Sequence, residues 1–345
     1  MSTSLPVIPT DVDGVRRALA VAATARVRAH PNPWVGAVLM TTDGQVFTGA
    51  TGEPGGLHAE AAAVAAAREA GTDVAGATVF VTLEPCVRFE GKRTPSCAET
   101  LRDAGVRRVV VAMLDPDERV SGHGVALLRE AGVEVVTDVL RTEAEALLRP
   151  YVHHRRTGRP WVLLKMGATL DGRTAAPDGT SQWITGPEAR ADAHQLRAES
   201  DAILVGAGTV RLDDPALDVR HVDGPHPRRI VLGHAPEGAK VHPCTEMSGP
   251  LTDVLDTLGA EGVVQLLVEG GAAVAGDFHR QGLVDQYVLY LAPALFGGSD
   301  ARGLFTGEGA PTMAELWRGE MVDHRRVGAD LRVDLLAART QEEIR

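Results

Sequence analysis

The sequence predicts two successive α/β domains, and three of its features carry this prediction. Its 345 residues exceed one ordinary domain and fit two domains of about 150 residues each. Apolar runs typical of buried strands alternate with helical stretches along the chain, which is the pattern of layered α/β domains. The alternation breaks once, where two prolines and a glycine flank a basic cluster. We therefore predict a first domain at 1–149, a linker at 150–160 and a second domain at 161–345.

In the first domain, turn and stop signals separate the predicted elements. The first two strands are joined by Thr42-Asp43-Gly44, a turn sequence that favours a hairpin. Two of the helices are followed by Gly71 and Gly105, and glycine commonly terminates a helix. The predicted helices are 11–29, 58–70, 97–104 and 124–131, and the predicted strands are 35–40, 45–49, 78–83, 108–113 and 133–136.

The second domain contains glycine-rich turns that follow apolar strands. The turn at 270–271 leads into a predicted helix at 272–280, and a similar turn lies at 206–209. Free N–H groups at such a helix start favour an anion such as a cofactor phosphate, and glycine permits its close approach. Strand-to-helix turns also use glycine for structural reasons alone, and the absence of GxGxxG gives no support to a Rossmann site. The predicted strands are 161–166, 202–205, 229–232, 265–268 and 286–291.

Composition excludes several classes of protein. The net charge of −11, without a long basic run, disfavours a nucleic-acid partner because phosphate backbones repel an acidic protein. No stretch approaches the roughly 18 apolar residues of a membrane span, and the first ten residues do not resemble a signal peptide. The cysteines Cys86, Cys97 and Cys244 are too few for a disulfide framework, and we interpret Cys244 as structural. We therefore expect a soluble cytoplasmic protein.

Four residues of the first domain combine a metal site with a proton carrier. His58-Ala59-Glu60 precedes Pro85-Cys86, and Cys97 follows after ten further residues. Two thiolates and one imidazole suit zinc and leave a fourth position for water, whose pKa the metal lowers. Glu60 can then carry protons from the water to the substrate nitrogen and the departing ammonia. Each residue alone is more often a packed or surface residue, but together they form the zinc deaminase signature, in which the glutamate is not a metal ligand.

The local sequence agrees with this assignment. His58 opens a predicted helix after Gly55-Gly56, and Cys97 lies in the first turn of another, where the helix dipole favours a thiolate. The ten residues between the two cysteines exceed the two of the usual deaminase pattern. We therefore interpret 87–96 as an insertion on the substrate side of the site.

A series of motifs gives the first domain a family resemblance. In order, these are His30-Pro31-Asn32-Pro33, Val35-Gly36, His58-Ala59-Glu60, residues 82–86, Arg93-Thr94-Pro95, residues 113–116 and Val120-Ser121-Gly122. They resemble the deaminase half of the bifunctional deaminase–reductase of riboflavin biosynthesis, and the resemblance continues to about residue 336. It implies a cytidine-deaminase-like α/β/α fold, zinc on His58, Cys86 and Cys97, Glu60 as proton donor, and substrate contacts from Asn32 and Arg93.

The chain departs from this family in two places. Members usually carry a short histidine-containing loop after Pro-Cys, whereas residues 87–92 here contain no histidine. Many members also have Tyr-His where this chain has Ala50-Thr51. Because both histidines would be expected to touch substrate, the identity of the deaminase substrate stays open. Arg88, Lys92 and Arg93 either hold a ribose phosphate or are solvated surface charges.

The second domain resembles the reductase half of the same family, through Leu164–Gly167, Thr169–Arg173, Ser181–Thr185, Val205–Thr209, Asp213–Leu217 and Val268–Gly271. The resemblance implies a dihydrofolate-reductase-like α/β fold, NADPH as cofactor, and a homo-oligomer. Arg197 and Arg220 suit a phosphate, because a guanidinium can donate two parallel hydrogen bonds to it. The implied NADPH contacts are Gly167, Trp183, Thr209, Asp213, Gly271, Ala272 and Ala273, and the implied substrate contacts are Lys165, Ser181, Arg197, Leu217, Arg220 and Glu269.

The resemblance implies two consecutive reactions. A phosphoribosylaminopyrimidine is deaminated hydrolytically, and its ribosyl group is then reduced to ribityl with NADPH. The altered loop leaves open a diverged paralogue that acts on another aminopyrimidine or a purine-like compound. The sequence also admits an enzyme with only the reductase active, a nucleic-acid deaminase, which the acidic charge disfavours, and a non-enzymatic zinc module. Glu60 argues against the last, since structural zinc prefers a fourth protein ligand.

Overall fold

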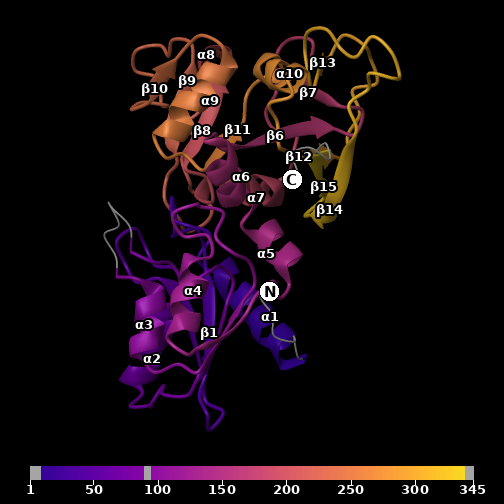
Figure 1. The fold of residues 1–345 in the computed structure, drawn as a ribbon. Helices are drawn as coiled ribbons and strands as arrows, with labels where there is room; N and C mark the ends of the chain where they lie inside the picture. The colour runs from indigo at the N-terminus through magenta and orange to yellow at the C-terminus, as the bar shows by residue number, and fades with distance from the viewer. Residues whose placement is uncertain (1–8, 89–94, 339–345) are drawn as a thin grey trace. The chain divides into compact units, whose positions relative to one another are not determined.

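The computed structural model describes residues 9–88 and 95–338, and the chain divides into two compact units, Met1–Thr157 and Gly158–Arg345 (Figure 1). The segment predicted as a linker, 150–160, is mostly helical, because helix α6 (Arg149–Thr157) covers most of its residues. Pro150 does not prevent the helix because it lies in the first turn, where its missing N–H has no partner to lose. Within the described residues, no helix is both long and apolar enough to cross a membrane.

The first unit is built on a five-stranded sheet in the order β2-β1-β3-β4-β5. Strand β1 (Gly36–Met40) runs antiparallel to both of its neighbours, and the last three strands are parallel. The predicted hairpin between β1 and β2 is confirmed, and the Thr41 hydroxyl accepts a 3.0 Å hydrogen bond from the Gln45 N–H across the turn. The other elements are β2 (Val46–Ala50), β3 (Thr78–Val81), β4 (Arg108–Val111), β5 (Glu134–Val136), α1 (Pro9–Ala23), α2 (Ala59–Glu69), α3 (Cys97–Asp103), α4 (His123–Glu130) and α5 (Arg141–Leu147).

Helices α1 and α2 pack on opposite faces of this sheet, and two glycines allow the close approach. A Cβ atom at Gly36 would lie 2.1 Å from the Ala18 carbonyl of α1, and one at Gly49 would lie 2.1 Å from the Ala59 carbonyl of α2. Gly49 pairs with Ala37, the neighbour of Gly36 in β1, so the alternation of a strand puts the two glycines on opposite faces. This packing fixes the start of α2 against the sheet.

Helix α1 is shorter than the predicted 11–29. It ends at Ala23, after which the Thr24 hydroxyl donates to the Val21 carbonyl at 2.7 Å. The chain then continues in tight turns, and the Asn32 N–H donates to the Ala29 carbonyl at 2.8 Å. These turns replace the last part of the expected helix and lead Asn32 to the site described below.

The second unit contains an eight-stranded sheet in the order β10-β9-β8-β11-β6-β12-β15-β14. The strands from β10 to β12 are parallel, and the hairpin of β14 and β15 adds an antiparallel edge. The five predicted strands are confirmed; the hairpin was not predicted. The elements are β6 (Trp161–Thr169), β7 (Arg173–Ala175), β8 (Ala202–Gly206), β9 (Arg228–Leu232), β10 (Thr245–Met247), β11 (Gln265–Val268), β12 (Gln286–Ala292), β13 (Arg302–Gly303), β14 (Gly319–Val327), β15 (Asp330–Ala337), α7 (Pro187–Ala198), α8 (Ala207–Asp213), α9 (Leu251–Ala260) and α10 (Ala272–Arg280).

Both faces of this sheet are covered, and its topology brings two turns together. Val162 and Leu164 of β6 pack with Phe278 of α10 in one apolar cluster, whereas Trp161 and Leu163 belong to a second cluster. Strands β8 and β11 are adjacent and parallel, so their carboxyl ends meet at one edge of the sheet. Each leads directly into a helix, α8 and α10, which places both helix starts at that edge.

Candidate active sites

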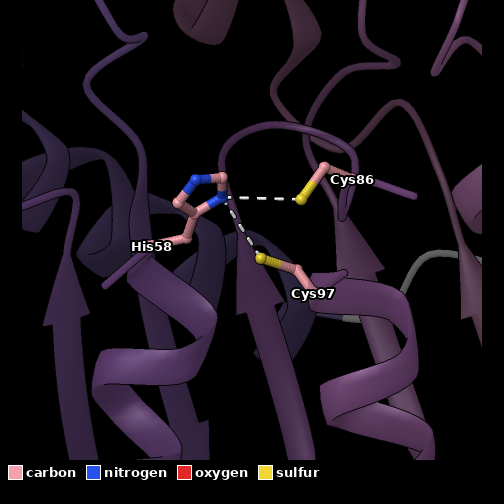
Figure 2. Close-up of side chains that lie close together, drawn as sticks. All are labelled: His58, Cys86 and Cys97. Atoms are coloured by element: carbon pink, nitrogen blue, oxygen red, sulfur yellow. Dashed lines mark hydrogen bonds between the residues drawn. The ribbon is translucent and has the colours of Figure 1, made fainter. Parts of the chain in front are cut away.

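In the first unit, the predicted metal ligands come together from three separate elements. His58 immediately precedes α2, Cys86 follows β3 and Cys97 opens α3. The Nδ1 atom of His58 lies 3.5 Å from the Cys86 sulfur and 3.4 Å from the Cys97 sulfur (Figure 2). Figure 2 shows the imidazole turned toward both sulfur atoms. The three ligand atoms all lie within 4.8 Å of one another.

This donor set fits zinc. An ion bound at about 2.0–2.3 Å from an imidazole nitrogen and a thiolate sulfur holds the two atoms about 3.5 Å apart in tetrahedral geometry. The observed separations of 3.4 and 3.5 Å agree with this spacing. Two soft sulfur ligands and one imidazole favour zinc over a hard cation, and three protein ligands leave a position for water.

Hydrogen bonds join the two cysteine segments despite the long loop between them. The Ser96 hydroxyl donates to the Cys86 carbonyl at 3.1 Å and accepts from the Glu99 N–H at 3.1 Å, which caps α3. The Ala98 N–H also donates to the Cys86 carbonyl, at 3.2 Å. The first turn of α3 is therefore tied directly to the backbone of Cys86, whatever the length of the loop.

Glu60 lies beside these ligands in the first turn of α2 and is 3% exposed. Burial, followed by the negative charge of Cys86, raises the pKa of Glu60 to about 7, against an opposing effect of His58. A carboxyl group with a pKa near neutrality can both accept and return a proton at physiological pH. The position and environment of Glu60 therefore suit a proton carrier.

Glu84 supports the Cys86 segment, a role that sequence reasoning missed. Its buried carboxylate accepts hydrogen bonds from the N–H groups of Gly122 and Gly124 at 2.9 Å, Val125 at 3.1 Å and Asp115 at 3.3 Å. A carboxylate at the start of α4 is also favoured by the helix dipole. This network anchors the turn that ends in Cys86.

Replacing Glu84 by glutamine is expected to lower the free energy of unfolding of the first unit by about 1–3 kcal/mol, because buried N–H groups lose a charged acceptor. Zinc should also be released more readily, since the Cys86 segment is held less firmly. Urea denaturation and the rate of zinc transfer to a chelator measure the two effects. The matched control is Glu130→Gln, at an exposed position of α4; equal values for both variants would contradict the role of Glu84.

Two of the ligands, His58 and Cys86, line a cleft of about 430 Å³. Asn32 lines it, as the resemblance implied, together with His58, Glu60 and Cys86. Thr51, at the place where many family members have histidine, also lines the cleft, but its hydroxyl donates to the Pro33 carbonyl at 3.0 Å. The other lining residues are Pro31, Pro33, Val35, Pro54, Gly55, Leu83, Glu84, Asp115, Asp117, Arg119, Val120, Tyr151 and Arg155.

Among the described residues of the loop between the two zinc cysteines, no basic side chain lines this cleft. Lys92 and Arg93, either phosphate ligands or solvated charges by the sequence, lie outside the described residues. Arg88 is exposed, donates to Glu99 at 2.7 Å and does not line the cleft. The predicted phosphate role is therefore not supported for Arg88.

In the second unit, most predicted cofactor residues gather around two adjoining pockets. A pocket of about 260 Å³ is lined by Gly167, Trp183, Thr209, Asp213, Gly271 and Ala272, together with the predicted substrate residues Lys165, Ser181 and Glu269. The second pocket, of about 340 Å³, shares Thr209, Gly271 and Ala272 with the first and adds Ala273. Arg302, which sequence reasoning missed, lines both.

The shared wall of these pockets fits a phosphorylated cofactor. It contains the starts of α8 and α10, neither of which is capped by a side chain. Backbone N–H groups at helix starts favour phosphate, and a Cβ atom at Gly208 would meet nothing within 4 Å, so the backbone is open to a ligand there. The Gly271 N–H donates to the Thr209 hydroxyl at 3.2 Å, which links the two turns. The residues present therefore suit NADPH.

Arg197, predicted as a phosphate ligand, is paired with a carboxylate in this structure. Its guanidinium donates to both carboxylate oxygens of Glu269, at 2.6 and 2.9 Å, and to the Asp218 carbonyl at 3.0 Å. The two parallel hydrogen bonds expected for a phosphate are thus made to Glu269. Burial raises the pKa of Glu269, but Arg197 and Lys165 more than offset this, and the pKa falls to about 2.

Two further predicted substrate residues do not line this pocket. Leu217 is buried in the apolar cluster that contains Trp161, and Arg220 is exposed and paired with Asp218 at 3.1 Å. Lys165 does line it, with its ammonium 3.7 Å from Glu269. Cys244, interpreted as structural, packs partly buried against the same apolar cluster.

The two sites define a zinc deaminase joined to a reductase that uses a phosphorylated cofactor. Residues 9–113 match the cytidine and deoxycytidylate deaminase zinc-binding region, and residues 160–333 match the RibD C-terminal domain. The chain belongs to the RibD family, the bifunctional deaminase–reductases of riboflavin biosynthesis. The family, the fold class of each domain, and zinc and NADPH as cofactors are thereby confirmed as predicted.

The relatives cover nearly the whole chain. The riboflavin biosynthesis protein RibD of Escherichia coli is 37% identical over 93% of this chain and 98% of its own, and that of Mycobacterium tuberculosis is 40% identical over 89% and 92%. Among solved structures, Acinetobacter baumannii RibD is 34% identical with a TM-score of 0.88, covering 95% of this chain and 99% of its own. A deaminase/reductase from Thermotoga maritima is 29% identical with a TM-score of 0.86 and the same coverage. Neither a diverged paralogue that acts on another compound nor an enzyme with only the reductase active is favoured.

Proposed function

We propose that the first unit deaminates diaminohydroxyphosphoribosylaminopyrimidine, the compound named for the Thermotoga maritima relative. His58, Cys86 and Cys97 would hold zinc, which when bound makes hydroxide available near neutral pH. The observation that carries this proposal is that His58, Cys86 and the buried Glu60 line one cleft with Asn32, while Cys97 completes the ligand cluster. The altered loop then changes how the substrate is held and not which reaction occurs.

In this reaction Glu60 handles the protons. Its carboxylate accepts one from the attacking water and delivers it to the pyrimidine ring nitrogen, and a second transfer lets the amino group leave as ammonia. Asn32, on the wall of the same cleft, can both donate to and accept from the polar edge of the ring. Its half-buried side chain would orient the amino-bearing carbon toward Glu60.

We propose that the second unit reduces the ribosyl group of the deaminated product to ribityl. NADPH when bound supplies the hydride, and the starts of α8 and α10 would hold its phosphates. Lys165 and Ser181 face the same pocket and can donate hydrogen bonds to the ribosyl oxygens. Arg197 acts as a positioning residue, since it fixes the Glu269 carboxylate that lies against Lys165.

We propose further that the enzyme works in the cytoplasm as a homo-oligomer. Support for self-association comes from β14, the edge of the large sheet, which carries the exposed side chains Met321 and Val322. Although charged residues surround these two side chains, an exposed edge strand presents backbone N–H and C=O groups with which another copy can pair. Sedimentation analysis of the full chain tests this, and a monomer at micromolar concentration would contradict it.

Removal of zinc separates the two activities. Dialysis of the full chain against a chelator is expected to abolish ammonia release, while NADPH oxidation driven by the already deaminated compound persists. Re-addition of zinc should restore ammonia release. Ammonia release that survives the loss of zinc, verified by metal analysis, would contradict the proposed role of His58, Cys86 and Cys97.

A further inference from the structure

Apart from Glu60, the carboxylates that line the deaminase cleft are hydrogen-bonded to partners in the protein, and this bears on the arginines of the cleft. Asp115 accepts from the Tyr151 hydroxyl at 3.0 Å and from the Asp117 N–H at 2.9 Å. Asp117 in turn accepts two hydrogen bonds from the Arg119 guanidinium, at 2.8 and 2.5 Å, and one from the Arg119 N–H at 3.1 Å. The Glu84 carboxylate accepts hydrogen bonds from backbone N–H groups, as described above. Among the described residues, the cation on this wall that is left without a carboxylate partner is therefore Arg155.

Arg155 is an exposed residue of α6 that borders the cleft. Within the part of the chain that the structure describes, its guanidinium forms no ion pair, although, beside a hydrogen bond from Arg119, its positive charge helps to lower the pKa of Asp117. The central carbon of the guanidinium lies 5.1 Å from the centre of the Tyr151 ring. Tyr151 is buried and its hydroxyl is bound to Asp115, so the ring is a fixed platform under the guanidinium. The next residue, Arg156, differs in both respects, because it pairs with Glu145 at 4.0 Å and does not line the cleft.

We propose that Arg155, together with Arg119 of the same cleft, binds the phosphate of the deaminase substrate. The inference rests on the proposed function, in which the substrate carries a phosphoribosyl group. A guanidinium carries several N–H donors, so Arg155 can contact Tyr151 and still donate two parallel hydrogen bonds to a phosphate. Asp117 holds Arg119 in place, so both arginines are positioned before the substrate arrives.

The proposal also accounts for how this chain manages without the family's loop histidine. A phosphate dianion in the cleft needs a cation, and Arg88 of the loop is directed to Glu99 instead. Helix α6 supplies Arg155 from a different part of the chain, about sixty residues after the zinc cysteines in the sequence. The basic cluster at the end of the first unit would thus belong to the active site rather than to a solvated linker.

Arg155→Met tests this in the full-length, zinc-loaded enzyme, with Arg156→Met as the matched control. The KM for the phosphorylated diaminopyrimidinone is expected to rise about 10- to 100-fold in Arg155→Met, the effect of losing charge-assisted hydrogen bonds, with kcat within about twofold. For the dephosphorylated nucleoside, KM should be unchanged in both variants. Methionine keeps the aliphatic contact with Tyr151, and zinc content together with unaltered NADPH oxidation verifies folding.

Inorganic phosphate provides a second readout with the wild-type enzyme. It should inhibit ammonia release from the nucleoside competitively, and this inhibition should weaken in Arg155→Met but not in Arg156→Met. Equal KM values for the phosphorylated substrate in the two variants, or no inhibition of the wild type by phosphate, would overturn the proposal. Failure of the wild type to release ammonia from either compound would instead overturn the proposed function.

Discussion

Glu60→Gln is expected to lower the rate of ammonia release by a factor of about 10²–10⁴, the usual contribution of a positioned proton carrier. Glutamine has nearly the same shape as glutamate and can occupy the same buried position, but it cannot accept a proton from water. Zinc should remain bound, because Glu60 is not one of the three ligands. NADPH oxidation driven by the deaminated compound should be unchanged, since Glu60 lies in the first unit. Single-turnover ammonia release with metal analysis measures the effect.

Glu69→Gln, at the exposed end of the same helix, is the control for this substitution. It removes one negative charge from α2 without touching the cleft, so its rate should match that of the wild type. A Glu60→Gln enzyme that keeps zinc and retains more than about a tenth of the wild-type rate would show that another group carries the protons.

Arg197→Met is expected to lower the free energy of unfolding of the second unit by about 3–5 kcal/mol, the usual cost of removing one partner of a buried ion pair. Glu269 has a side chain that is only 9% exposed, and it would then keep only the more distant Lys165 as a cationic partner among the described residues. Urea denaturation of the full chain measures this loss as a lower midpoint for the unfolding of the second unit. Arg228→Met, which breaks an exposed pair with Glu261, should cost no more than about 1 kcal/mol.

The stability difference between the wild type and Arg197→Met should depend on pH in one direction. The pKa of Glu269 is lowered in the folded protein from an ordinary value of 4.5 to about 2. Its ion pairs therefore add stability above pH 4.5 and lose this contribution as the pH falls from there toward 2. The gap between wild type and Arg197→Met should narrow over that range. A gap that stays constant or widens would show that Arg197 stabilises the unit by packing alone.

The zinc site was open to prediction because its chemistry restricts the residue types. Two cysteines, a histidine and a glutamate in this order and spacing are typical of zinc deaminases, and the structure brings the three ligands together as expected. The five strands predicted in the second domain were equally accessible, since apolar runs such as Leu266–Val268 are fully buried. The hairpin of β14 and β15 was missed because β14 is exposed along almost its whole length and so has no apolar pattern.

Several features of the sites depend on contacts between residues far apart in the sequence. Arg197 and Glu269 are 72 residues apart, so no local pattern indicates that the arginine serves a carboxylate instead of a phosphate. Arg155 lies in a segment whose prolines and basic residues indicate a linker, and only the fold shows that it stacks on Tyr151 at the cleft. The anchoring role of Glu84 depends on α4, whose first residues lie about forty positions further along the chain.

The central claim is that one chain performs two consecutive reactions, and a single assay tests it most directly. Purified, zinc-loaded enzyme is given the phosphorylated diaminopyrimidinone and NADPH, and ammonia and NADPH are followed together. The account predicts one ammonia released for each NADPH oxidised, with ammonia appearing first and both signals absent in Glu60→Gln. NADPH oxidation without ammonia release, or ammonia release that no NADPH oxidation follows, would contradict it.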